Sequence, residues 1–196
     1  TSDTSTASAS GSILIATGDA KASGQQAGDI SIEVGISNSD NGSNIALIAG
    51  ETLTGKGTGG SINLNAASAT TGGDILATAG SGLAGNGGNV RLSAGDSDTE
   101  FGTGGSVSIL AGSGVEGTSA GGDVSLQAGS STAANGGDMR INSGASTSSD
   151  SGSTIISTAS VSSADATSGK LSLTTGNALT GNAGDISVSA GASAEA

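Results

Sequence analysis

The residue types that carry out most enzyme chemistry are missing from this sequence. Its 196 residues include no His, no Cys and no Tyr, while seventeen Asp or Glu stand against five Lys or Arg. The usual general base, the thiol nucleophile and most ligands of transition metals are therefore absent. We expect no enzyme activity and no catalytic residues, and the carboxylates remain as the groups with a chemical role to test.

The densest group of carboxylates is formed by Asp96, Asp98 and Glu100. Carboxylate oxygens are the ligands that Ca²⁺ prefers, so these three residues are the candidates for a metal site and Ca²⁺ is the one cofactor considered. A solvated acidic loop without a metal is the alternative, and the sequence favours it. No cofactor is otherwise expected.

Five further Asp residues each follow a Gly, and they resemble the calcium-binding nonapeptide repeats of secreted bacterial toxins. Those repeats need a Gly-Gly-any-Gly-any-Asp motif that recurs every nine residues, and the present chain has neither the motif nor the period. A turn-capping role is therefore the better interpretation. The five residues are Asp29, Asp74, Asp123, Asp138 and Asp185.

Charge and aromatic content exclude two classes of partner. The net charge is −12 and Phe101 is the one aromatic residue, so the chain has neither the basic patch nor the stacking platform that nucleic acids require. An anionic membrane surface is disfavoured for the same electrostatic reason. Apolar runs such as Ile13–Ala16 are four residues long, too short for membrane insertion.

An internal repeat organises the sequence. The segment Gly121–Gly129 reads Gly, Gly, small polar, apolar, any, apolar, any, small, Gly, and twelve copies of this unit can be placed end to end. The first apolar position is filled by Ile13, Ile30, Ile45, Ile62, Ile75, Val90, Val107, Val124, Met139, Thr154, Leu171 and Ile186. The second is filled by Ile15, Ile32, Leu47, Leu64, Ala77, Leu92, Ile109, Leu126, Ile141, Ile156, Leu173 and Val188.

The alternation inside each unit predicts a short β-strand with one buried face. A third position on the same face, two residues further on, is nearly always small, as at Ala49 and Ala128, which suggests that two layers converge there. The Gly residues that flank each unit are expected to supply positive φ and close approach of the backbone at the bends.

Taking every other unit gives a longer period of about 32 residues, because a Leu or Val followed by any residue and a Gly occurs after odd units, as at Leu53 and Leu83. This predicts an all-β fold, a parallel β-solenoid (β-helix) of about six coils with two strands per coil. In that register Asp138 would lie next to Lys170. An antiparallel sandwich with hairpin links is the alternative.

We expect residues 1–10 to form a flexible N-terminal arm and residues 11–196 to form a single solenoid domain. The Gly-Gly-polar-Ile-any-Leu unit with Ser-, Ala- and Gly-rich loops resembles repeat regions of predicted extracellular or cell-surface proteins of marine algae such as diatoms and haptophytes. The resemblance covers nearly the whole chain, implies an extracellular or cell-surface structural role, and carries no catalytic residues.

The outward positions of the odd units predict where a neighbouring molecule packs. They hold a stripe of apolar residues, which soluble monomers seldom leave bare, so a homo-oligomer or filament is the expected partner. Two functions follow: a structural protein that assembles into a filament, sheath or adhesive layer, or a module that binds a cation, mineral, glycan or ice surface. The expected interface residues are Leu14, Ala16, Ala46, Ile48, Leu76 and Leu110.

Overall fold

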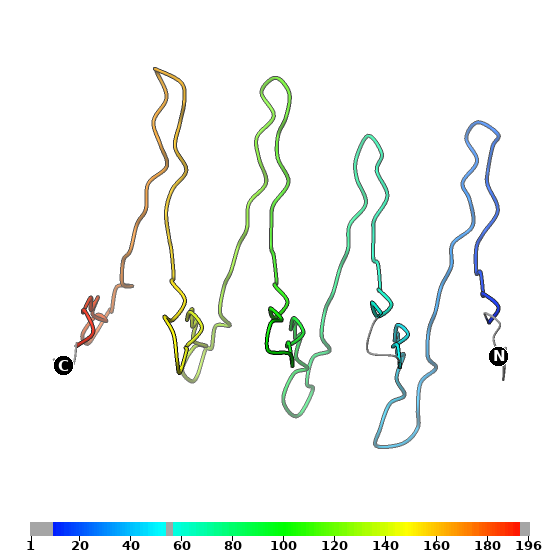
Figure 1. Ribbon diagram of the computed structural model, residues 1–196, viewed down its shortest axis with the longest axis horizontal. Helices are drawn as coiled ribbons and strands as arrows, with labels where there is room; N and C mark the ends of the chain where they lie inside the picture. Colours follow the sequence, from blue (N-terminus) through cyan, green and yellow to red (C-terminus); the bar gives the residue numbers. More distant parts are fainter. Residues whose placement is uncertain (1–9, 54–56, 193–196) are drawn as a thin grey trace. The chain divides into compact units, whose positions relative to one another are not determined.

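The predicted β-solenoid is wrong. A computed structural model describes residues 10–53 and 57–192, and these residues contain no helix and no β-strand. Figure 1 accordingly shows extended segments that reverse direction at narrow bends, without the coiled ribbon of a helix or the arrow of a strand in the described residues. The antiparallel sandwich is absent from the described residues for the same reason.

The most regular feature of the backbone is a hydrogen bond that closes the loop between consecutive units. The amide of the second glycine of one unit donates to the carbonyl of the residue that ends the unit before it, as in Gly60 to Gly50 (2.8 Å) and Gly122 to Gly112 (2.9 Å). The other closures join Gly73 to Ala67, Gly88 to Gly80, Gly105 to Gly95, Gly137 to Gly129 and Gly152 to Gly144. We call these seven segments the closed loops.

The closures explain why the repeat has a glycine at the donor position and a small residue at its third position. A Cβ atom added to Gly105 would lie 3.2 Å from the Cβ of Ala94 and 3.3 Å from the amide nitrogen of Gly95. The same crowding recurs at Gly60, where the Cβ of Ala49 would be 3.3 Å away. The third position of each unit is therefore small because it lies against the glycine of the closure, and not because two layers converge.

Positive φ, in contrast, is a property of a few turns. Within the described residues it occurs at Gly24, Gly117 and Gly181, and none of these is the donor of a closed loop. Gly24 is the third residue of a turn in which the amide of Gln25 donates to the carbonyl of Ala22 (3.2 Å). Close approach of two backbone segments is what the paired glycines provide.

Four of the seven closed loops fall into two types, which differ at the residue two places after the loop start. In loops 80–88 and 112–122, which we call the pinched loops, the glycine two residues after the start has no room for a side chain. A Cβ on Gly82 would lie 2.3 Å from the carbonyl oxygen of Gly85, and one on Gly114 would lie 2.3 Å from that of Ser119.

In loops 129–137 and 144–152, which we call the serine loops, a hydroxyl occupies the same position. The Oγ atom of Ser131 accepts from the amides of Ala133 (3.4 Å) and Ala134 (2.9 Å). Ser146 repeats the arrangement with the amides of Ser148 (3.4 Å) and Ser149 (3.0 Å). The side chain thus substitutes for a backbone acceptor inside the loop.

The described residues have no hydrophobic core. None of their side chains is buried, and half-buried positions are confined to alanines at the third position of the unit: Ala49, Ala79, Ala94 and Ala128. The chain exposes 19460 Å², whereas a folded monomer of 17.9 kDa exposes about 8,000 Å². Every large apolar side chain therefore faces solvent in the isolated chain.

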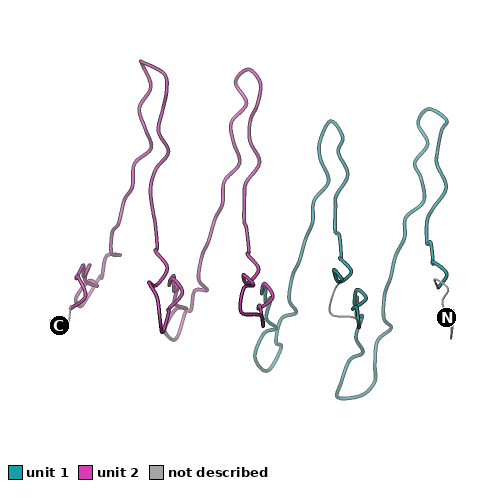
Figure 2. Ribbon diagram, in the orientation of Figure 1, with its two compact units in different colours: residues 1–93 teal, residues 94–196 magenta. Residues whose placement is uncertain are grey.

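Above the level of the repeat, the chain divides into two compact units, Thr1–Ser93 and Ala94–Ala196 (Figure 2). Each contains closed loops of its own, with 50–60 and 80–88 in the first and 95–105 and 129–137 in the second. Of the predicted arm 1–10, residues 1–9 lie outside the described residues.

The physical reason for the missing strands is local closure. In a solenoid, backbone hydrogen bonds join residues one coil apart, about 32 residues in the predicted register, whereas the turns and closures observed join residues three to ten apart. Asp138 likewise forms an ion pair with Arg140, two residues away, in place of the predicted proximity to Lys170. The chain has 37 Gly residues to order. Because no side chain of residues 10–53 and 57–192 is buried, hydrophobic burial does not offset the entropy cost of long-range pairing.

Candidate functional site

The predicted metal candidates lie in one closed loop, 95–105. The amide of Gly105 donates to the carbonyl of Gly95 (2.8 Å) at the base, and the amide of Gly102 donates to the carbonyl of Thr99 (3.2 Å) at the tip. Asp96, Asp98 and Glu100 are all exposed. Among the described residues, no three acidic side chains gather closely enough to hold a metal ion, so the structure gives no geometry for Ca²⁺.

The tip of the same loop presents the sole aromatic side chain of the sequence. Glu100 and Phe101 are the two central residues of the turn from Thr99 to Gly102. Phe101 is 93% exposed. A ring this exposed covers no other part of the chain, and the loop carries a carboxylate and an aromatic ring side by side.

The predicted interface residues are on the surface. The large ones, Leu14, Ile48, Leu76 and Leu110, are 82–89% exposed. Ala16 and Ala46, which come from the same units, are exposed too. These six residues offer apolar area to a partner.

The alternation within the units persists as a difference in exposure. In ten of the twelve units the first apolar position is 50–63% exposed, which is lower than the 82–89% of the four large interface residues. In the units that hold Ile48, Leu76 and Leu110, the predicted outward side chain is therefore more exposed than the first apolar position, whereas Ile13 and Leu14 of the first unit are equally exposed.

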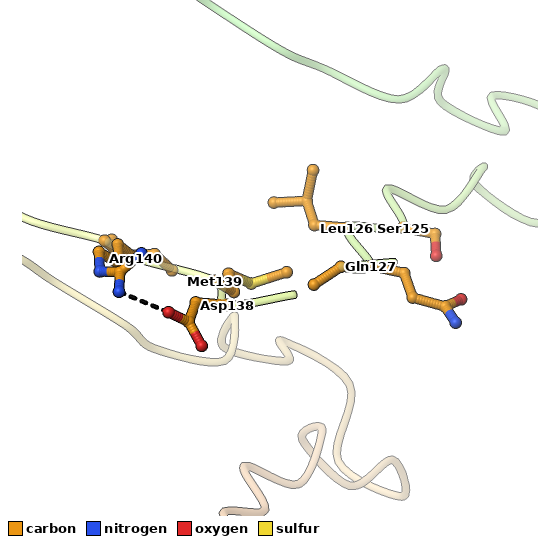
Figure 3. A pocket seen from close by; sticks show the side chains of 8 residues that line it. Ser125, Leu126, Gln127, Asp138, Met139 and Arg140 are labelled. Carbon is orange, nitrogen blue, oxygen red and sulfur yellow. Dashed lines mark hydrogen bonds and ion pairs between the residues drawn. The ribbon is translucent and has the colours of Figure 1, made fainter. Parts of the chain in front are cut away.

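A hollow of about 440 Å³ lies between two extended segments of the second compact unit, Ala94–Ala196. Residues 125–128 form one wall and residues 138–141 the other, and the closure of Gly137 to Gly129 (2.8 Å) joins them at the end of the hollow. In Figure 3, Leu126 lies above Met139 and Gln127 extends toward the opposite side from Arg140. We call this the Met139 hollow.

Charge is placed at one end of the Met139 hollow. The guanidinium of Arg140 donates to the carboxylate of Asp138 (2.5 Å), as the dashed line in Figure 3 shows. Both side chains are more than half exposed, so water screens the pair and its contribution to stability is small. The guanidinium has five N–H donors, and one carboxylate does not occupy them all.

Sequence reasoning missed this hollow. The pattern predicts Met139 and Ile141 on the buried face of a strand, and the alternation places Arg140 between them on the outward face. The available signal is the Asp-Met-Arg order, in which the one Met of the chain fills a position that the other units give to Ile, Val, Leu or, once, Thr.

No protein-family model, no curated protein and no solved structure matches this chain. The described residues also contain no helix that is long and apolar enough to cross a bilayer.

Proposed function

We propose that the protein is a structural protein that assembles with copies of itself into an extracellular filament, sheath or adhesive layer. The observation that carries the proposal is the exposure of all 35 large apolar side chains. Isolated apolar residues are ordinary on a surface, but a chain with no buried side chain among its described residues has to bury apolar area against other molecules to gain hydrophobic stability.

The area available far exceeds the need of an ordinary interface. The exposed area of 19460 Å² is larger than that of a folded monomer of this mass by about 11,000 Å², and a standard interface buries about 1,600 Å² in total. One partner on one side would leave most of the excess exposed. Repeated contacts along the chain, which a repeated sequence provides, fit an extended assembly.

The extracellular or cell-surface location rests on the resemblance to algal surface repeat proteins. The structural role fits a sequence without His, Cys or Tyr, because a structural layer needs none of these residues. The residues proposed to meet a neighbour are the six interface residues named above, of which Leu14, Ile48, Leu76 and Leu110 contribute most apolar area.

The proposal is tested by sedimentation velocity and electron microscopy of the full chain. We expect wild-type protein at physiological salt to form particles much larger than one chain. The double substitution Ile48→Asp and Leu76→Asp removes two side chains that would each contribute about 1.5 to 3 kcal/mol on burial, and it should raise the concentration needed for assembly about a hundredfold or more.

The matched control is the double substitution Asn63→Asp and Asn65→Asp, which adds the same charge at polar positions of the same compact unit, Thr1–Ser93, and should leave assembly nearly unchanged. A wild-type chain that stays monomeric at high concentration would contradict the proposal. If such monomers bind a mineral, glycan or ice surface, the surface-binding alternative takes its place.

A further inference from the structure

We infer that the tip of loop 95–105 on one chain docks into the Met139 hollow of a second copy. This inference rests on the proposed function, because it names one contact by which copies assemble. Both surfaces belong to the compact unit Ala94–Ala196. In the single chain Phe101 is nevertheless 93% exposed and the hollow is open. Each therefore lacks an occupant within its own chain.

The chemistry of the two surfaces is complementary. Leu126, Met139 and Ile141 line the hollow and provide an apolar floor, while the aromatic ring at the loop tip is the largest apolar side chain that the sequence can offer. Thioether sulfur contacts aromatic rings favourably, and a guanidinium stacks on an aromatic face. Met139 and Arg140 place both groups at the hollow.

Charge fixes the orientation. Glu100 precedes Phe101 in the tip turn, and Arg140 stands at one end of the hollow with N–H donors beyond the one that Asp138 accepts. With the ring over Met139, the carboxylate of Glu100 can pair with the guanidinium. This pair is exposed, so it selects the orientation more than it adds affinity.

The loop is built to present its tip. The base closure of Gly105 to Gly95 and the tip turn of Gly102 to Thr99 hold the loop at two levels, which lowers the entropy lost when Phe101 is immobilised. Since the tip and the hollow are formed by different residues, the contact is heterologous. Contacts of this kind propagate into rings or open filaments.

The direct test replaces Phe101 with the photoreactive aromatic residue p-benzoylphenylalanine. An equal mixture of ¹⁵N-labelled and unlabelled full-length chains is allowed to assemble and is then irradiated. We expect mass spectrometry to find mixed-label cross-links from position 101 to residues 125–128 or 138–141. The same photoreactive residue at position 83, another exposed tip of a closed loop, should not label the hollow.

A second measurement uses assembly itself. Phe101→Ala should raise the concentration needed for assembly about tenfold or more, as expected for an aromatic anchor, while Phe101→Leu should have a smaller effect and Leu83→Ala almost none. Because Phe101 is exposed in the single chain, these substitutions leave its closures intact.

The outcomes separate the two proposals. Cross-links within one chain, or to sites outside the hollow, overturn the docking inference while assembly of the wild type still supports the structural role. Normal assembly of Phe101→Ala overturns the inference in the same way. A wild-type chain that does not assemble overturns both.

Discussion

The pinched loops and the serine loops close in the same way and are held differently inside. In loop 80–88, the backbone of Gly85 and Asn86 lies where a side chain on Gly82 would be. In loop 129–137, the hydroxyl of Ser131 accepts hydrogen bonds from two backbone amides. The pinched loops also carry an apolar tip, Leu83 or Val115, which the serine loops lack. The two loop types share one closure and differ at the residue two places after the loop start, which is Gly in the pinched loops and Ser in the serine loops.

The largest effect is expected at the pinch itself. In Gly82→Ala the new Cβ would meet the carbonyl oxygen of Gly85 at 2.3 Å, so the loop must open and the amide of Gly88 should lose its protection against hydrogen exchange. Gly85→Ala is the matched control, because no atom lies within 4 Å of the added Cβ. Retained protection of Gly88 in Gly82→Ala would show that the pinch is dispensable.

A smaller effect is expected at the donor glycine, which every closed loop has and which is Gly105 in loop 95–105. In Gly105→Ala the Cβ meets the Cβ of Ala94 at 3.2 Å, whereas in Gly104→Ala the nearest atom is 3.8 Å away. We expect exchange of the residue 105 amide to become roughly fivefold faster in the first variant, for a cost of about 1 kcal/mol. The second should be neutral or slightly slower, because alanine restricts the open chain.

The serine loops should respond more weakly. Ser131→Ala removes one acceptor from two exposed amides, which water then solvates, so the loss is at the low end of about 0.5 to 1.5 kcal/mol. Exchange at Ala134 should rise about two- to threefold. Ser130→Ala in the same loop is the control, and an equal rise there would mean that the hydroxyl bond of Ser131 is not responsible.

The smallest effect separates loops by charge. Loop 95–105 holds three carboxylates and loop 129–137 holds none, so about 1 M salt should relieve repulsion in the first loop alone. We expect slower exchange of the Gly105 amide, by less than about twofold, and no change at Gly137. Equal responses of the two amides would show that charge plays no part in loop stability.

The sequence predicted the need for close approach of the backbone at the paired glycines. It failed on how the units associate and on the burial of one face, because no described side chain is buried. The pattern of Ile45, Leu47 and Ala49 fits a strand with one buried face equally well whether its neighbour is one coil away or just beyond the next loop. Periodicity specifies which residues share a face, and it does not specify what covers that face.

The site was predictable to a lesser degree. Asp96, Asp98 and Glu100 were found by composition, but the turn that places Glu100 and Phe101 at the loop tip depends on the hydrogen bond from Gly102 to Thr99, which no motif in this loop predicts. The Met139 hollow arises from two units on either side of one closure, so no single unit encodes it.

The short span of the closures has a kinetic consequence. Loops of about ten residues close in about 10 to 100 ns, and each closed loop forms from its own residues without waiting for distant ones. Opening one leaves the next in place, so heating the single chain should melt its loops one by one over a broad range of temperature, with no sharp heat-absorption peak. A cooperative transition would then report the assembly, and a whole unit could be duplicated or lost without disturbing the fold of the units beside it.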